Sequence, residues 1–291
     1  MSEPRYRDRP RGTGSLRQRL KNVTELDDQL LDRRLRTMAA VIVAQMLPPA
    51  LIKGGTSMTL RRGATNSRAS ADVDAARLGP ITEDDFIAQF RLNAAKGWSG
   101  FTGTVVERPK RSRDGVADQY VMRPLTVRLS YENSTFRTVV VELAYNELGS
   151  TGGELFDVPQ DIVDMFVEIG VERPEAVALL PTEHQIAQKL HACTELNQNG
   201  TNGRAHDLVD IQILCANDEI NPVELSEAGH RVFAIRKSGT WPPTITSLPG
   251  WDSIYFEAAQ GLGVRPLDEA IQWLNELIEA ADLARDKESM P

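Results

Sequence analysis

The segment from Lys53 to Asp74 constrains the fold of this chain more than any other. It reads Lys-Gly-Gly-Thr-Ser and, after a stretch of helical character, Asp72-Val-Asp74. Glycine has no side chain to hold a ligand off, so a Gly-Gly turn at the start of a helix can present bare amides to a phosphate. Asp72 and Asp74 are two residues apart, which places both carboxylates on one face of a strand. Paired carboxylates beside phosphates are typical of a Mg²⁺ site. The segment therefore predicts a strand, a turn and a helix that hold a nucleotide next to a metal ion.

A third carboxylate is a candidate for the same metal site. Glu142 interrupts the otherwise apolar run at 138–143. An unpaired buried carboxylate is costly, so a glutamate in such a strand normally has a partner or a metal. Three carboxylates can hold two metal ions for phosphoryl or nucleotidyl transfer. We therefore expect Asp72, Asp74 and Glu142 to come together from neighbouring strands.

Further residues of the same segment are candidates for binding the phosphates. Lysine and arginine supply positive charge, and serine and threonine supply hydroxyls. Arg68 and Ser70 could instead hold the aspartates in place, and Lys53 could be a solvated lysine at the end of a strand. The candidates are Lys53, Gly54, Gly55, Thr56, Ser57, Arg68 and Ser70.

A second group of polar residues lies in the last third of the chain. Lys189 lies in a predicted helix with an apolar stripe, and Arg204, Asp207 and Asp210 belong to the next one. Asp207 and Asp210 are one helical turn apart and face the same way. One of them is expected to orient Arg204 or Lys189, or to face the active cleft. Lys189 could reach a triphosphate. The nearby histidines, His191 and His206, are expected to be structural.

Composition and charge limit the class of protein. Hydrophobic residues make up 41% of the 291 residues, and no run approaches the roughly 18–20 apolar residues of a membrane span. The two cysteines lack metal-like spacing, and the polar start does not resemble a signal peptide, so we expect a cytoplasmic protein with reduced thiols. The net charge of −8 argues against a protein that coats nucleic acid in bulk. Basic runs at 5–21 and 108–113 still permit a defined RNA or DNA contact.

The patterning predicts two lobes of different composition. Residues 1–15 read as a flexible basic arm, 16–175 as an α/β lobe and 176–291 as a helical lobe. Thr82 is the expected N-cap of its helix. Proline-rich stretches at 241–243 and 248–251 read as a rigid connector. Helices are predicted at 16–47, 56–62, 81–96, 182–196, 205–216, 221–237 and 267–285, and strands at 50–52, 71–75, 101–107, 120–129 and 136–143.

Four ordered motifs give the sequence a family resemblance. Lys53-Gly-Gly-Thr-Ser57, Arg68-x-Ser70-x-Asp72-x-Asp74, the Gln185–Lys189 segment and Arg204-Ala-His-Asp207-Leu-Val-Asp210 resemble the AbiEii/AbiGii-type nucleotidyltransferase toxins, including the mycobacterial MenT group, within the DNA polymerase β superfamily. The likeness extends from about residue 16 into the C-terminal third. It implies an α+β, bilobed fold, with a polymerase β-type α/β lobe carrying a mixed sheet and a mainly helical C-terminal lobe.

The resemblance also implies an activity. Members of the family transfer nucleotides from an NTP to the 3′ acceptor end of tRNA, which blocks aminoacylation, and each has a cognate antitoxin protein. Asp72 and Asp74 would bind Mg²⁺, with Glu142 at the third-carboxylate position. Lys53, Ser57 and Lys189 would engage the nucleotide, and Asp210 matches the last motif. The basic runs would suit a tRNA backbone.

Two other function classes fit the same motifs. A nucleotidyltransferase acting on a small molecule or on protein hydroxyls would need the same metal and phosphate residues. A non-catalytic nucleotide-binding module would not need the two aspartates and Lys53 together. The oligomeric state is not indicated by the sequence, and we expect a monomer.

Overall fold

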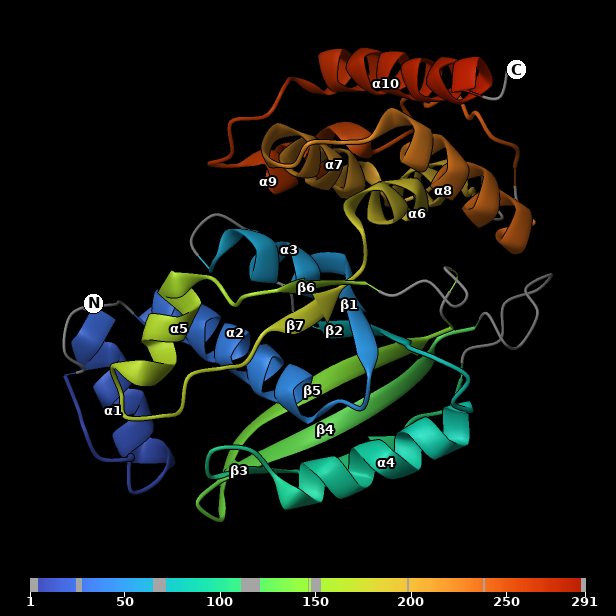
Figure 1. The fold of residues 1–291 in the computed structure, drawn as a ribbon. Coiled ribbons are helices and arrows are strands. Elements are labelled where there is room, and N and C mark those ends of the chain that lie inside the picture. The colour runs from blue at the N-terminus through green and yellow to red at the C-terminus, as the bar shows by residue number, and fades with distance from the viewer. Residues whose placement is uncertain are drawn as a thin grey trace. The chain divides into compact units, whose positions relative to one another are not determined.

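The computed structural model describes residues 5–24, 28–64, 72–110, 121–145, 147, 153–197, 199–237 and 239–288. The chain divides into two compact units, Met1–Leu180 and Pro181–Pro291. Figure 1 draws the first unit in blue to yellow and the second in yellow to red. The first unit contains both helices and strands, whereas the elements described in the second are all helices. The predicted α+β class, with a mixed sheet, is confirmed.

The first unit is built on a seven-stranded mixed sheet in the order β3-β4-β5-β2-β1-β7-β6. Strand β2 pairs antiparallel to β1 and parallel to β5, so the sheet is mixed at its centre. The strands are β1 (Ala50–Lys53), β2 (Asp72–Arg77), β3 (Phe101–Glu107), β4 (Arg123–Tyr131), β5 (Ser134–Ala144), β6 (Glu154–Phe156) and β7 (Val177–Leu179). The two short strands β6 and β7 have no counterpart in the sequence prediction, because three residues carry too little periodicity to be recognised.

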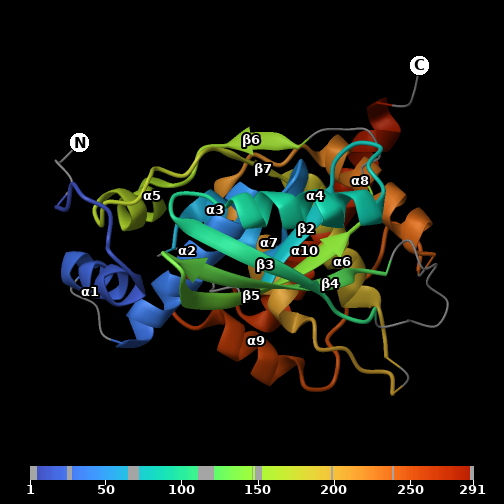
Figure 2. The same ribbon diagram turned by 90° about the horizontal axis from the view of Figure 1, so that it is seen from below.

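Helices α1 (Thr13–Thr24), α2 (Asp28–Met46), α3 (Gly54–Arg62), α4 (Glu83–Lys96) and α5 (Gln160–Val167) belong to the same unit. The helical pattern at 16–47 is divided between α1 and α2, and α5 has no predicted counterpart. Thr82 caps α4 as expected, since its hydroxyl accepts a hydrogen bond from the amide of Asp85 at 3.1 Å. Figures 1 and 2 show α4 running alongside β3, which it contacts.

The two faces of the sheet differ in chemistry. One face joins the buried side chains of α1, α2, α4 and α5 in a single hydrophobic core, to which Phe101, Val127 and Val141 contribute from neighbouring strands. Alternate residues of the same strands point the other way. We call this second side the open face, because most of its residues on β3, β4 and β5 are exposed or half-buried. The open face carries the aspartates of β2.

Residues 5–12 make specific contacts, although the arginines, prolines and glycines there predict a flexible arm. The amide of Tyr6 donates to the carbonyl of Glu168 at 3.2 Å, and the buried hydroxyl of Tyr131 donates to the carbonyl of Pro10 at 2.8 Å. Arg19 donates to the carbonyl of Asp8. These long-range hydrogen bonds fix a segment that has no periodicity of its own.

The second unit consists of packed helices. They are α6 (Thr182–Thr194), α7 (Ala205–Asn217), α8 (Pro222–Arg236), α9 (Trp251–Ala259) and α10 (Leu267–Glu288). Helix α6 contacts α7 and α8, and α10 contacts α8. The stretch predicted as a rigid connector at 248–251 leads into α9, where Trp251 is fully buried. The indole of Trp251 donates to the carbonyl of Asn202 at 2.8 Å, so this tryptophan belongs to the core of the unit.

Across the described ranges, every helix is too short or too polar to cross a lipid bilayer.

Candidate functional site

The centre of the open face carries the residues that the sequence singles out. Lys53 on β1 is registered with Asp74 on β2, and Asp74 is registered with Glu142 on β5. Residues in register on neighbouring strands point to the same face of a sheet. Lys53, Asp74 and Glu142 therefore form one row across three strands, and Asp72 lies one step further along β2 on the same face. The predicted placement of the three carboxylates on neighbouring strands agrees with this register.

The Gly-Gly turn is fitted closely to this row. Helix α3 begins at Gly54, directly after Lys53. Gly54 has φ of +60°, and a Cβ atom at this position would lie 2.8 Å from the carboxyl carbon of Asp74. Both the left-handed backbone and the close approach therefore require glycine. The first amides of α3 consequently lie beside the Asp74 carboxylate, in a helix start that favours an anion.

The hydroxyls of Thr56 and Ser57 have structural partners. Thr56 donates to the carbonyl of Asp72 at 2.7 Å, and Ser57 donates to the carbonyl of Gly54 at 3.0 Å. Both side chains are buried. The sequence predicts these hydroxyls beside the phosphates, and the structure adds that they tie α3 to β2 and close the Gly-Gly turn. These hydrogen bonds hold the start of α3 in place next to β2.

The donor set fits a hard divalent cation. Asp72 and Asp74 offer carboxylate oxygens on one face, next to a helix start that suits phosphate. Over the residues that the structure describes, no group of three or more His, Cys, Asp and Glu side chains is gathered closely enough to hold a metal by itself. Mg²⁺ does not need such a group, because it is usually bound by one or two carboxylates together with substrate phosphates and water. The pair of aspartates therefore suits Mg²⁺ that arrives with a nucleotide.

Some predicted residues fall outside the described ranges. Arg68 and Ser70 lie in the undescribed segment 65–71, and Arg111 and Arg113 lie in the undescribed segment 111–120. The preceding basic residue, Lys110, forms an ion pair with Glu83 at 3.3 Å.

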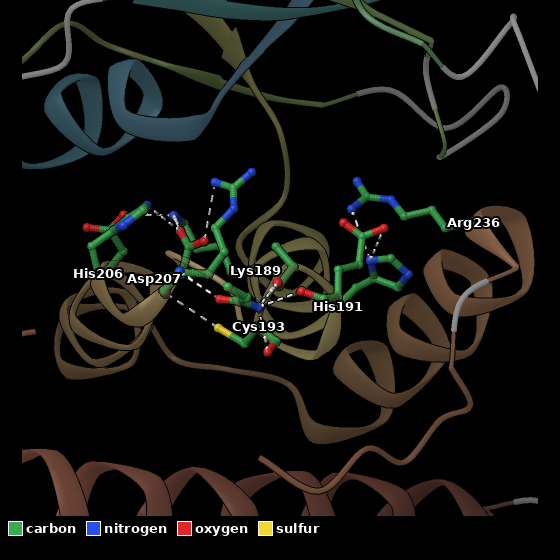
Figure 3. Close-up of polar contacts among 11 residues, drawn as sticks. Lys189, His191, Cys193, His206, Asp207 and Arg236 are labelled. Atoms are coloured by element: carbon green, nitrogen blue, oxygen red, sulfur yellow. Dashed lines mark hydrogen bonds and ion pairs between the residues drawn. The ribbon is translucent and has the colours of Figure 1, made fainter. Parts of the chain in front are cut away.

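The second unit contains a buried ion-pair cluster. The ammonium of Lys189 on α6 lies 2.6 Å from a carboxylate oxygen of Asp207 and 2.7 Å from one of Asp210, both on α7 (Figure 3 shows Lys189 and Asp207). The side chains of Lys189, Asp207 and Asp210 are only 11%, 5% and 4% exposed. Arg204, at the start of α7, is 46% exposed and lies 3.6 Å from Asp207. The prediction that an aspartate orients Lys189 or Arg204 agrees with these contacts.

The cluster determines the ionisation of its members. Burial alone would lower the pKa of Lys189, but the charges of Asp207 and Asp210 outweigh burial, and the pKa is raised. Burial alone would raise the pKa of Asp207, but the charges of Lys189 and His206 outweigh it, and the pKa is lowered. Burial, reinforced by Asp207, raises the pKa of the Cys193 thiol well above its ordinary value. Cys193 is therefore a protonated core residue.

Asn202 connects the two helices that bear the cluster. Its amide nitrogen lies within hydrogen-bond distance of the carbonyls of Ala192, Cys193 and Glu195 at the end of α6 (2.9, 3.0 and 2.8 Å). Its amide oxygen accepts from the backbone amide of Arg204 at 2.7 Å. Asn202 thus caps α6 and fixes the start of α7. Asn202 is not among the predicted site residues, because its only local signal in the sequence is an asparagine between two predicted helices.

The two histidines near the cluster differ in environment. His191 is fully buried and packs edge-on against Phe233, with ring centroids 4.8 Å apart. Its Nδ1 lies 3.4 Å from the Arg236 guanidinium. Both residues are labelled in Figure 3. His206 is partly exposed, and its Nε2 lies 3.8 Å from Asp207. His191 therefore lies within the helical core, while His206 flanks the ion-pair cluster.

The site indicates the class of protein, and a family model then identifies the family. The arrangement of a Gly-Gly helix start beside a strand with two aspartates is typical of nucleotidyltransferases. Residues 36–286 match the model of the family described as nucleotidyl transferase AbiEii toxin, type IV TA (toxin–antitoxin) system. The chain belongs to the AbiEii nucleotidyltransferase toxin family. This confirms the resemblance seen in the four motifs.

One solved structure shows a similar fold. MenT4, a nucleotidyltransferase toxin from Mycobacterium tuberculosis H37Rv, is similar with a TM-score of 0.51 and 16% identity, over 92% of this chain and 99% of that one. A putative nucleotidyltransferase from H. pylori is 17% identical, with a TM-score of 0.43 over 91% of this chain and 100% of that one. No curated protein matches the sequence. At these identities the first likeness shows the fold alone, and the second carries no further argument.

Proposed function

We propose that this protein is a Mg²⁺-dependent toxin that transfers a nucleotide from an NTP to the 3′ acceptor end of tRNA, which blocks aminoacylation and translation. Family membership supports the toxin and the nucleotidyl transfer. The observation that carries the proposal is the row of Lys53, Asp74 and Glu142, with Asp72 beside it, next to the glycine start of α3. The row provides groups for a metal and for phosphates at one place.

Each part of the row has a proposed task. Asp72 and Asp74 hold Mg²⁺, and Glu142 is the candidate for a third carboxylate. The amides at Gly54 and Gly55, with Lys53, bind the phosphates of the NTP. Bound Mg²⁺ supplies positive charge at the transferring phosphorus and the leaving phosphates. Thr56 keeps the helix start against β2, so that the phosphate groups and the carboxylates stay in register.

The reaction balances without a further co-reactant. The 3′-hydroxyl oxygen of the RNA forms a bond to the α-phosphorus of the NTP, the bond from that phosphorus to the β-phosphate oxygen breaks, and pyrophosphate leaves. The hydroxyl proton is released. Such a transfer depends on positioning and on charge stabilisation rather than on a covalent intermediate with the protein.

Within the second unit, Arg204 is the proposed nucleotide contact. The buried cluster of Lys189, Asp207 and Asp210 holds α6 against α7, and Arg204 remains half-exposed at the start of α7. We assign Lys189 and Asp210 to this support and Arg204 to the nucleotide. A cognate antitoxin protein is the proposed partner, and the protein is proposed to act in the cytoplasm as a monomer.

Incubation of the purified protein with Mg²⁺, total tRNA and each of four labelled NTPs tests the proposal. We expect label on the 3′ end of tRNA with at least one NTP. Asp72→Asn, which keeps the side-chain shape and removes the charge, should abolish labelling, whereas Asp84→Asn on the exposed start of α4 should not. Absence of labelled tRNA with all four NTPs would refute the tRNA assignment, and label on protein or on a small molecule would identify a different acceptor.

A further inference from the structure

The open face continues beyond the carboxylates in one direction along the strands. Asp72 on β2 is registered with Val140 on β5, and two residues further along β5 lies Thr138. Thr138 is registered with Arg128 on β4, which is in turn registered with Thr104 on β3. These three side chains form a second row, parallel to the row of carboxylates. With a rise of about 3.3 Å per residue, the four steps from Glu142 to Thr138 span about 13 Å.

The chemistry of this part of the open face is distinctive. Beyond the row of Glu142, its positions on β3, β4 and β5 carry no acidic residue, although the protein as a whole has a net charge of −8. Arg128 is the one charged residue among them, and its side chain is exposed. The remaining positions are mainly hydroxyl residues. In register order the nine positions are Val106, Thr126 and Val140, then Thr104, Arg128 and Thr138, then Thr102, Ser130 and Thr135.

The other direction along the open face is closed. Leu51, Ala76 and Ala144 are the next residues along β1, β2 and β5 on the same side, and they form a buried apolar cluster with Leu180. An acceptor that reaches the carboxylates along the sheet must therefore approach from the side of Arg128. Arginine and hydroxyl side chains are common contacts for phosphates and sugars, and they carry no base specificity.

We propose that the open face of β3, β4 and β5, defined as the nine positions above, binds the sugar–phosphate backbone of the acceptor RNA next to its 3′ end, with Arg128 as the phosphate contact. The positive side chain on an acid-free, hydroxyl-rich surface complements a polyanion. Continuity with the carboxylate row places this surface beside the reacting end of the RNA. This inference rests on the proposed function, because it names how the same site holds its substrate.

Three variants of Arg128 in the full-length protein test the surface. Arg128→Gln removes the charge, Arg128→Glu reverses it and Arg128→Lys retains it. Loss of one phosphate contact should raise the KM for tRNA by about five- to tenfold. It should also reduce the steepness with which the logarithm of the tRNA binding constant falls with the logarithm of salt concentration, by about one. We expect a larger effect for Glu, little effect for Lys, and an unchanged kcat at saturating tRNA. Binding of the NTP should not change.

A matched control and a second variant keep the test specific. Arg173→Gln removes an exposed arginine from the segment between α5 and β7 and should leave the KM for tRNA unchanged. Thr104→Val with Thr138→Val removes two hydroxyls while keeping the β-branched shape, and should raise the KM by about two- to tenfold.

The outcomes separate this inference from the proposed function. If the wild-type protein labels tRNA and Arg128→Glu has the same KM and salt slope, the open face does not bind the RNA and the inference is overturned. If the wild-type protein labels no RNA, the proposed function fails first. If Arg128→Glu weakens binding of the antitoxin but leaves the KM for tRNA unchanged, the face binds protein and the inference is again overturned.

Discussion

Replacement of Lys189 by methionine gives the sharpest test of the second unit. Methionine is similar in length but uncharged, so Lys189→Met leaves Asp207 and Asp210 buried together without the ammonium that lies 2.6 and 2.7 Å from them. Removing one partner of a buried ion pair typically costs about 3–5 kcal/mol, because the remaining charge is uncompensated. A domain has only about 5–15 kcal/mol of stability, so the expected loss is a large fraction of the total.

The pH dependence of this loss has a definite sign. In the wild-type protein the pKa of Asp207 is lowered, so its contribution is present above the unfolded value of about 3.9 and is lost as pH falls through the folded pKa. The pKa of Lys189 is raised, so its contribution is complete below about 10.4 and is lost as pH rises through the folded pKa. Between about pH 5 and pH 9 the pair therefore adds a constant term to the free energy of unfolding.

The variant reverses this behaviour. Without Lys189, we expect burial and the neighbouring Asp210 charge to raise the pKa of Asp207 above its unfolded value, because both disfavour the charged form. Protonation of Asp207 then removes the free-energy cost of its buried charge. The free energy of unfolding of the variant should therefore rise as pH falls from 8 to 5. His206, 3.8 Å from Asp207, and Arg204, 3.6 Å away, remain in both proteins. The difference between variant and wild type therefore reports the loss of the lysine together with the response of these two neighbours.

Hydrogen exchange followed by mass spectrometry measures this difference within the full-length protein. Peptides that cover 182–217 report the opening free energy of α6 and α7 at pH 5, 6, 7 and 8, after correction for intrinsic exchange rates. Lys287→Met, at an exposed position of α10, is the matched control and should have no effect. The triple variant Lys189→Met, Asp207→Asn, Asp210→Asn should recover most of the loss. A cost below about 1 kcal/mol at pH 7, unchanged at pH 5, would show that the carboxylates are not buried with the lysine.

Two further substitutions probe single contacts. Gly54→Ala should lower the rate of nucleotidyl transfer more than tenfold, with an unchanged circular dichroism spectrum, because the added methyl group meets Asp74. Gly79→Ala is the control. Gly79 has a similar φ of +77° and no atom within 4 Å of its Cβ position, so transfer should not change. Asn202→Ala should lower the free energy of unfolding by about 1–3 kcal/mol, because carbonyls at the end of α6 lose their hydrogen-bond donor. The loss should appear as faster hydrogen exchange at the end of α6. Equal exchange in Asn202→Ala and in the control Asn199→Ala would contradict the capping role.

The sequence predicted the parts of the site that depend on local periodicity. The two-residue spacing of Asp72 and Asp74 determines that they share a face, and this holds for any strand that contains them. The place of Glu142 required one more step, the parallel pairing of β2 with β5, which is a long-range contact. Its apolar surroundings nevertheless predicted a strand next to that of the aspartates, and the register agrees with the expectation.

Contacts between distant segments could not be predicted in the same way. Asn202 has no periodicity or motif, and its role depends on where the end of α6 meets the start of α7. The hydroxyls of Thr56 and Ser57 are suited in kind to bind phosphate, but only the structure shows that both donate to backbone carbonyls. Residues 5–12 have the composition of a flexible arm and are fixed by contacts with residues more than a hundred positions away.

The geometry of the second unit also assigns different roles to its two most prominent cations. Lys189 and its two aspartates together carry a formal charge of −1, and two of the three N–H groups of the lysine already point to carboxylates. Such a cluster would repel a triphosphate rather than attract one. Arg204 brings the total charge to zero, and it is the half-exposed member. We infer that Arg204 is the nucleotide-binding cation of this unit and that Lys189 acts by holding α7 in place. Accordingly, Arg204→Gln should raise the KM for NTP and leave hydrogen exchange in α6 unchanged. Lys189→Met should increase hydrogen exchange in both α6 and α7. An unchanged KM for NTP in Arg204→Gln would refute this assignment.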